Sequence, residues 1–104
     1  MSKVLLDMEA KIKNIIDQII KVCTESAHIE EIILYGSRAK GTHMEKSDID
    51  IALKGSDIDI ETLIDEIDNY ETLLKIDLVD IENCKNELLK KEVEEYGITI
   101  YRKT

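Results

Sequence analysis

The stretch YGSRAKGTHMEKSDIDIAL, residues 35–53, is the most informative part of this 104-residue sequence. After Tyr35, which follows an apolar run at 32–34, comes Gly36-Ser37. In a small-residue turn of this kind, backbone N–H groups can point at a phosphate. The stretch closes with Asp48-Ile49-Asp50, where acidic and apolar residues alternate. On a strand, the two carboxylates would share one face and the apolar side chains the other.

The paired carboxylates of Asp48 and Asp50 indicate a cation site. Two carboxylates side by side repel each other unless a cation lies between them. Ten residues separate this pair from Ser37. A phosphate-binding turn next to a cation site is typical of a centre that handles nucleotides, and this is the function that the stretch predicts.

The letters SDIDI occur twice, at 47–51 and at 56–60, so an Asp-x-Asp pattern alone is weak evidence in so acidic a chain. Asp57 and Asp59 stand at the start of a predicted helix, where each acid can stabilise the positive end of the helix dipole by about 0.3–1 kcal/mol. That structural role explains the second pair. The first pair continues into a predicted strand, where two acids have no structural benefit, so we assign the cation site to Asp48 and Asp50.

Hydrophobic periodicity predicts three amphipathic helices. Apolar residues recur at helical intervals over 5–23 and again from 60 to about 70, where the helix is expected to end near Tyr70 or Glu71. A last helix carries Leu89, Val93 and Tyr96 and stops at Gly97, with Asn83 or Asn86 as its cap.

Four strands are expected between these helices, at 29–35, 48–53, 75–81 and 98–101. Ser37 is expected to cap a short helix over 38–41, and Gly55-Ser56 to turn the chain. Helices and strands therefore alternate along the chain. This order predicts an α/β (α+β) fold with a small β-sheet of about four strands flanked by helices.

Composition limits the class of protein. A length of 104 residues suits a single domain spanning 1–104. The net charge of −9 argues against a general nucleic-acid surface, because phosphate backbones need clustered Lys and Arg. The N-terminal residues include acids and lysines and have no long apolar run, so we expect no signal peptide, no membrane span and a cytoplasmic location. Cys23 falls on an apolar helical stripe, which predicts a buried free thiol.

The pattern Gly36-Ser37, ten residues, Asp48-x-Asp50 resembles the signature of the DNA polymerase β-like nucleotidyltransferase superfamily. The short chain and the letters YGSRAKG look most like its minimal nucleotidyltransferases, called MNT. The resemblance implies a small mixed β-sheet flanked by helices. It also implies that Gly36 and Ser37 contact a triphosphate, and that Asp48, Asp50 and a third acid on a later strand, Asp77, hold magnesium.

Periodicity favours Asp77 over Asp80 as the third acid. Within the predicted strand 75–81, a period of two puts Asp77 on one face and Ile76 and Leu78 on the other. If the apolar residues face the core helices, Asp77 faces the same way as the first Asp-x-Asp pair. Asp80 lies near the strand end, where we expect it to be solvated.

Basic residues near the motif are candidates for neutralising the triphosphate. They are Arg38, Lys40 and Lys46, and a solvated surface position is the alternative for each. Lys40 stands where many family members have Arg, which keeps the charge but loses bidentate phosphate geometry. His43, in the same loop, is expected to be structural or exposed.

The resemblance implies an Mg²⁺-dependent enzyme that uses ATP, with two ions at the site. The MNT group acts as antitoxins that transfer AMP to a tyrosine of a HEPN-domain ribonuclease toxin, so the implied partner is such a toxin. One alternative is a binding antitoxin that masks the toxin without catalysis. Another is an enzyme that modifies a small molecule such as an aminoglycoside. Direct binding of nucleic acid is not expected.

Overall fold

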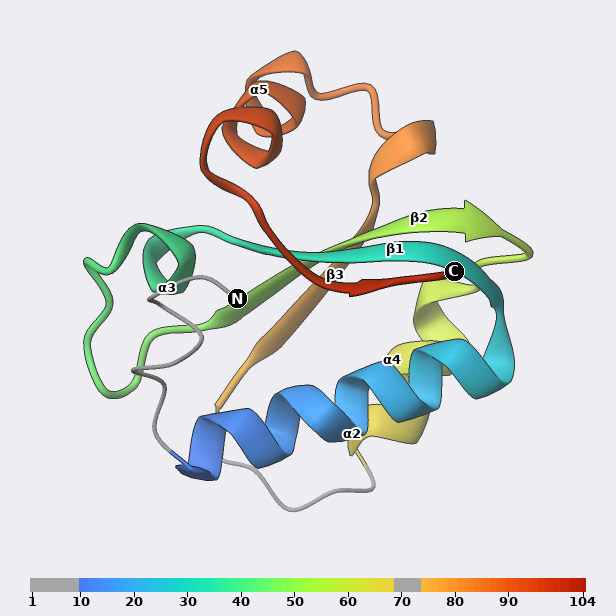
Figure 1. Ribbon diagram of the computed structural model, residues 1–104, viewed down its shortest axis with the longest axis horizontal. Helices are drawn as coiled ribbons and strands as arrows, with labels where there is room; N and C mark the ends of the chain where they lie inside the picture. Colours follow the sequence, from blue (N-terminus) through green and yellow to red (C-terminus); the bar gives the residue numbers. More distant parts are fainter. Residues whose placement is uncertain (1–9, 69–73) are drawn as a thin grey trace.

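The computed structural model describes residues 10–68 and 74–104 (Figure 1). Its elements confirm the predicted alternation of helices and strands. In chain order they are α2 (Ala10–Ser26), β1 (His28–Tyr35), α3 (Ser37–Lys40), β2 (Ile49–Ser56), α4 (Ile60–Asp68), β3 (Ile76–Asp80), the 3₁₀ helix η1 (Ile81–Asn83), α5 (Glu87–Tyr96) and β4 (Ile98–Arg102).

The four strands form one mixed sheet in the order β3-β2-β1-β4. β1 is antiparallel to both β2 and β4, whereas β2 and β3 are parallel. A parallel pair needs a crossover connection, and α4 lies in the segment that makes it. The predicted small mixed sheet flanked by helices is confirmed.

Helices α2 and α4 pack against one face of the sheet and bury the main core (Figure 1). The side chains that α2 buries recur at helical spacing and include Ile12, Ile16 and Ile19. A fully buried aliphatic side chain contributes about 1.5–3 kcal/mol, so this stripe holds α2 to the sheet. The predicted amphipathic helix is confirmed from residue 10 onward, and its predicted start at 5 lies outside the described residues. Cys23 is fully buried in this core, as predicted.

Helix α5 lies on the opposite face of the sheet, over a smaller apolar cluster (Figure 1). The buried members of this cluster are Ile33, Tyr35, Ala52, Ile81 and Val93. Since strand side chains alternate between faces, the neighbours of these strand residues belong to the main core on the other side. The face under α5 is also the one that carries the polar groups of the site.

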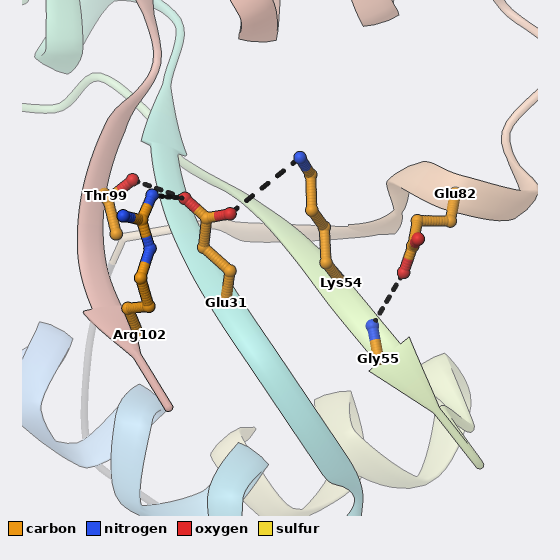
Figure 2. A network of polar contacts seen from close by, with 6 residues as sticks. All are labelled: Glu31, Lys54, Gly55, Glu82, Thr99 and Arg102. Atoms are coloured by element: carbon orange, nitrogen blue, oxygen red, sulfur yellow. Dashed lines mark hydrogen bonds and ion pairs between the residues drawn. The ribbon is translucent and has the colours of Figure 1, made fainter. Parts of the chain in front are cut away.

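A polar network ties β1 to its two neighbouring strands (Figure 2). The Glu31 carboxylate on β1 accepts hydrogen bonds from Thr99 Oγ1 at 2.5 Å and Arg102 Nη2 at 3.1 Å, both on β4. Lys54 Nζ on β2 lies 3.8 Å from the other oxygen. The hydrogen bond from Thr99, and then those positive charges, lower the pKa of Glu31.

Some predicted details were wrong. Ser37 is the first residue of α3 and not its cap, which is Gly36. Gly55-Ser56 belong to β2, where they pair with the start of β1, and the chain turns at Asp57 with a φ of +57°. Of the two predicted caps, Asn86 accepts a hydrogen bond from the Leu89 N–H at 3.1 Å.

The predicted end of the second amphipathic helix near Tyr70 or Glu71 lies outside the described residues. Within the part of the chain that the structure covers, every helix is too short or too polar to cross a membrane.

Candidate active site

The two ends of the 35–53 stretch meet at one cavity of about 660 Å³. Because β1 and β2 are antiparallel, the start of β2 lies beside the end of β1, and Tyr35 pairs with Asp50. The ten residues between Ser37 and Asp48 thus connect the two strands. The residues that line the cavity are Tyr35, Gly36, Ser37, Lys46, Ser47, Asp48, Asp50, Leu89 and Glu92.

The structure places Asp77 beside Asp50. The two residues are partners in the parallel register of β2 and β3. Lys75 Nζ lies 3.6 Å from Asp77 Oδ1, and the Asp77 side chain is 41% exposed. Asp48 is exposed and directly precedes β2. The parallel pairing thus brings the third predicted acid next to the Asp-x-Asp motif.

Asp80 lies farther along β3, in register with Leu53. Its Oδ2 accepts a hydrogen bond from Asn83 Nδ2 at 2.8 Å, whereas its Oδ1 is buried and has no hydrogen-bond partner among the described residues. The expectation that Asp80 is solvated was therefore wrong. The 3₁₀ helix η1 follows β3 directly and brings Asn83 within hydrogen-bonding distance of Asp80 Oδ2.

The electrostatics of Asp50 indicate that this corner of the sheet favours a cation. Burial raises the pKa of Asp50, and the negative charges of Asp77 and Asp48, a hydrogen bond with Asp77 and the charge of Glu92 raise it further. A bound cation would offset each of these charge repulsions. Carboxylate oxygens are also the ligands that Mg²⁺ prefers.

The acids alone do not form a complete metal cage. Across residues 10–68 and 74–104, no group of three or more His, Cys, Asp or Glu side chains is arranged to hold a metal ion. Mg²⁺ sites commonly use one or two carboxylates and take their other ligands from phosphates and water. The acids at this corner fit that kind of site, in which a bound nucleotide completes the shell.

Gly36 brings the β1 end close to the acids. Its φ of +74° lies in a region that favours glycine, and an added Cβ would collide with Asp50 Oδ2. The residue is therefore required for its conformation and for the close approach of the backbone to Asp50. Gly41 also has a positive φ, of +77°, but a Cβ there would meet open space.

The basic residues near the motif lie in three different environments. Lys46 is exposed and lines the cavity. Arg38 is only 4% exposed, does not line this cavity, and donates hydrogen bonds to backbone carbonyls. Lys40 Nζ lies 2.7 Å from Glu92 Oε1 and 5.0 Å from the centre of the Tyr96 ring. Of these three basic residues, Lys46 is the one that lines the cavity. From the sequence, His43 was expected to be either structural or exposed, and it is exposed.

Sequence reasoning did not assign Tyr35, Leu89 or Glu92 to the site. Burial, together with the nearby negative charges of Asp50, Asp77 and Glu92, raises the pKa of Tyr35 to about 12. The position of Tyr35 in the sequence, directly before Gly36 at the end of a predicted strand, could have indicated its place in the site. Leu89 and Glu92 come from α5 and share a helix face at a spacing of three, but no local motif links them to the cavity.

The second SDIDI copy has structural roles. Asp59 caps α4, because its carboxylate accepts hydrogen bonds from Thr62 N at 3.2 Å and Thr62 Oγ1 at 2.9 Å. Asp57 lies in the preceding turn, where His28 Nε2 is 3.5 Å from its Oδ2. The predicted helix-start role is thus confirmed for Asp59, whereas Asp57 is a turn residue.

Comparisons with known proteins agree with this geometry. The family model for "Polymerase beta, Nucleotidyltransferase" matches residues 17–104. A Methanocaldococcus jannaschii protein named "Putative protein adenylyltransferase" is 30% identical over 91 residues, which cover 83% of this chain and 91% of that protein.

Two solved structures have similar folds. A chain of a toxin–antitoxin crystallised with AMP-PNP is 27% identical, with a TM-score of 0.65 over 85% of this chain and 73% of that one. A chain from the complex of a tri-AMPylated Shewanella oneidensis HEPN toxin with an MNT antitoxin is 23% identical, with a TM-score of 0.61 over 88% and 72%. This second likeness concerns the fold alone.

The family match covers far more than half of the chain, including both Gly36-Ser37 and the Asp48-x-Asp50 pair. The chain therefore belongs to the polymerase beta nucleotidyltransferase family and is an enzyme of that class.

Proposed function

We propose that this enzyme transfers AMP from ATP, with Mg²⁺, to a tyrosine of a HEPN-family toxin and so acts as an antitoxin. The observation that carries the proposal is the pairing of Asp50 with Asp77 beside the Gly36-Ser37 turn. A relative named as a protein adenylyltransferase supports a protein acceptor. A similar toxin–antitoxin structure solved with AMP-PNP, an ATP analogue, supports both the nucleotide and the kind of partner.

Each part of the cavity has a role in this proposal. The backbone at Gly36-Ser37 and the ammonium of Lys46 bind the triphosphate. Asp48 and Asp50 in the cavity, and Asp77 beside Asp50 on β3, would hold magnesium together with the phosphates of the nucleotide. The ion would neutralise phosphate charge and stabilise the attacking and leaving oxygens of an in-line displacement.

The transfer forms one bond and breaks another. The tyrosine oxygen bonds to the α-phosphorus of ATP, and the bond from that phosphorus to the oxygen bridging to the β-phosphate breaks. Pyrophosphate leaves with the electron pair of the broken bond. The hydroxyl proton passes to the Asp77 carboxylate, whose side chain is partly exposed. The products are an AMP ester of tyrosine and pyrophosphate.

Exposed apolar side chains near lining residues in the sequence support a protein acceptor over a small molecule. Met44 is 78% exposed in the loop that carries Lys46, and Leu88 is 82% exposed beside the lining residue Leu89. Methionine and aromatic side chains are enriched at protein interfaces, and Tyr96 on the same helix is 51% exposed. The exposure of these apolar side chains supports a protein acceptor.

The test compares the two SDIDI copies in a transfer assay with α-phosphate-labelled ATP, Mg²⁺ and, as the candidate toxin, the protein encoded next to this one. We expect Asp48→Asn/Asp50→Asn to reduce labelling of the toxin by at least roughly 100-fold, since even residues that only orient metal ligands cost 10–100-fold. The matched control, Asp57→Asn/Asp59→Asn, should keep wild-type transfer, because Asn caps helices as well as Asp does.

The other outcomes identify the alternatives. If the Asp48→Asn/Asp50→Asn protein still neutralises the toxin in cells at normal expression, the protein is a binding antitoxin. Transfer to a small hydroxyl compound without any protein partner would identify a small-molecule enzyme. Equal labelling by wild type and by Asp48→Asn/Asp50→Asn would contradict the assignment of the acids.

A further inference from the structure

Arg38 is the one buried charged residue in the described part of the chain, with 4% of its surface exposed. Within residues 10–68 and 74–104, no acidic side chain forms an ion pair with it. A buried charge is unfavourable unless hydrogen bonds replace its hydration. The hydrogen bonds that Arg38 makes should therefore indicate its role.

All of these hydrogen bonds go to one loop, the segment 41–48 between α3 and β2. Arg38 Nε donates to the Ser47 carbonyl at 3.2 Å, and Nη2 donates to the same oxygen at 3.0 Å and to the Glu45 carbonyl at 3.1 Å. Two further hydrogen bonds close the loop on itself, from Met44 N to Ser47 Oγ at 2.8 Å and from Ser47 N to Met44 O at 3.1 Å. Arg38 thus anchors the turn over residues 44–47.

The anchored segment 41–48 carries residues of the site. Lys46 and Ser47 line the cavity, and Asp48 follows directly before β2. The two carbonyls that accept from Arg38 flank Lys46 in the chain. A change in the guanidinium position would therefore move the lysine and the first acid of the Asp-x-Asp pair together.

We infer that Arg38 is a positioning residue for nucleotidyl transfer. It fixes the 41–48 loop before nucleotide binds, so that Lys46 and Asp48 already face the cavity. This inference rests on the proposed function for the roles of those two residues. It differs from the direct nucleotide contact predicted for Arg38 from the sequence, because the guanidinium faces loop carbonyls and does not line the cavity.

Lysine cannot replace arginine in this role. A guanidinium is a rigid planar fork with five N–H donors, which can serve two carbonyls at once. An ammonium keeps the charge but presents its donors from one point on a flexible stem. Arg38→Lys therefore keeps the positive charge but removes the paired hydrogen bonds to the loop carbonyls, so the variant tests these two properties separately.

The control is Arg102→Lys, the same chemical change at the other arginine of the chain. Arg102 is 69% exposed on β4 and pairs with Glu31 (Figure 2), and it does not line the cavity. Thermal unfolding of both variants establishes that they are folded. Arg38→Gln is a second test variant. It removes the buried charge and its desolvation cost, so the inference stays testable if Arg38→Lys does not fold.

The first readout needs neither nucleotide nor activity. Amide hydrogen exchange at Met44 and Ser47 is measured by NMR in the free protein. We expect exchange to be faster by roughly tenfold in Arg38→Lys or Arg38→Gln, because the loop loses hydrogen bonds that oppose its local opening. Arg102→Lys should leave both rates unchanged. Unchanged rates in both Arg38 variants would overturn the inference.

The second readout separates positioning from phosphate contact. With wild type active, Arg38→Lys should lower kcat by roughly 10–100-fold and raise the Mg²⁺ concentration for half-maximal rate, as loss of residues that orient metal ligands does. A rise in KM for ATP alone, with loop exchange unchanged, would instead identify Arg38 as a phosphate contact. Inactive wild type would contradict the proposed function, whereas the exchange rates would still decide whether Arg38 holds the loop.

Discussion

At the scale of single residues, position 36 requires glycine for two separate reasons. Its φ of +74° and ψ of −157° belong to a region that only glycine adopts readily, and Asp50 occupies the space where a side chain would lie. The Gly-Ser turn and the Asp-x-Asp pair are thus in direct contact, and their spacing in the sequence reflects this contact.

Gly36→Ala and Gly41→Ala provide a matched pair of variants. Gly41 has an ordinary left-handed conformation and open space, so its substitution should cost about 1–2 kcal/mol of unfolding free energy from backbone strain alone. Gly36→Ala should cost more, because Asp50 must also move. It should also reduce transfer by roughly 100-fold, the effect of a displacement of about 1 Å in a reacting geometry.

Urea unfolding and the transfer assay measure these two effects. Full activity of Gly36→Ala would show that the contact with Asp50 has no role in the reaction. Equal unfolding free energies for the two variants would contradict the steric argument.

At the scale of elements, the sheet depends on polar contacts as well as on its core. Glu31 on β1 connects to both neighbouring strands through Thr99, Arg102 and Lys54 (Figure 2). These partners favour the ionised carboxylate, which is why the pKa of Glu31 is lowered. The network therefore links the stability of the sheet to pH.

Glu31→Gln should reveal this link. A carboxylate with a lowered folded-state pKa contributes stability that is fully present above its unfolded pKa of about 4.3. That contribution is lost as the pH falls through the folded-state pKa. Wild type should therefore exceed Glu31→Gln in unfolding free energy at pH 7, and the difference should shrink as the pH falls below the unfolded-state pKa.

Urea titrations at several pH values measure this difference. The control is Glu30→Gln, at the exposed neighbouring position on β1, which should show no such trend relative to wild type. A difference between wild type and Glu31→Gln that stays constant down to acid pH would contradict the role of the network.

At the scale of the whole molecule, the two thiols report on different states. Burial in the main core raises the pKa of Cys23 to about 12, with a smaller contribution from Glu66. Cys84 is only partly buried. We expect a thiol reagent at pH 8 to modify Cys84 in the native protein and Cys23 only after unfolding.

The number of rapidly modified thiols per chain measures this directly, in native buffer and in urea. Cys84→Ser should remove the native reaction, and Cys23→Ser should leave it intact. Rapid modification of Cys23 in the native Cys84→Ser protein would show that the core under α2 opens easily.

Much of this architecture could be predicted because it depends on local patterns. Alternation within 75–81 was sufficient to put Asp77 on the face of the first acid pair, and the parallel register brings it beside Asp50. Other features depend on contacts between distant segments. Glu92 reaches the cavity from α5 without a local motif, and the direction of Arg38 follows from the path of the loop that it anchors. Metal binding by the acids stays a prediction.

The pairing of β4 with β1 has a consequence for folding during synthesis. β4 is the last of the described elements to leave the ribosome, yet it lies beside one of the first. Until it emerges, one edge of β1 exposes unpaired backbone groups to other nascent chains. Closing this pair also costs more loop entropy than closing β1 on β2, since it joins Glu31 to Arg102. The β1–β2 pair that frames the cavity can therefore form early, whereas this edge of β1 becomes protected only after β4 has emerged.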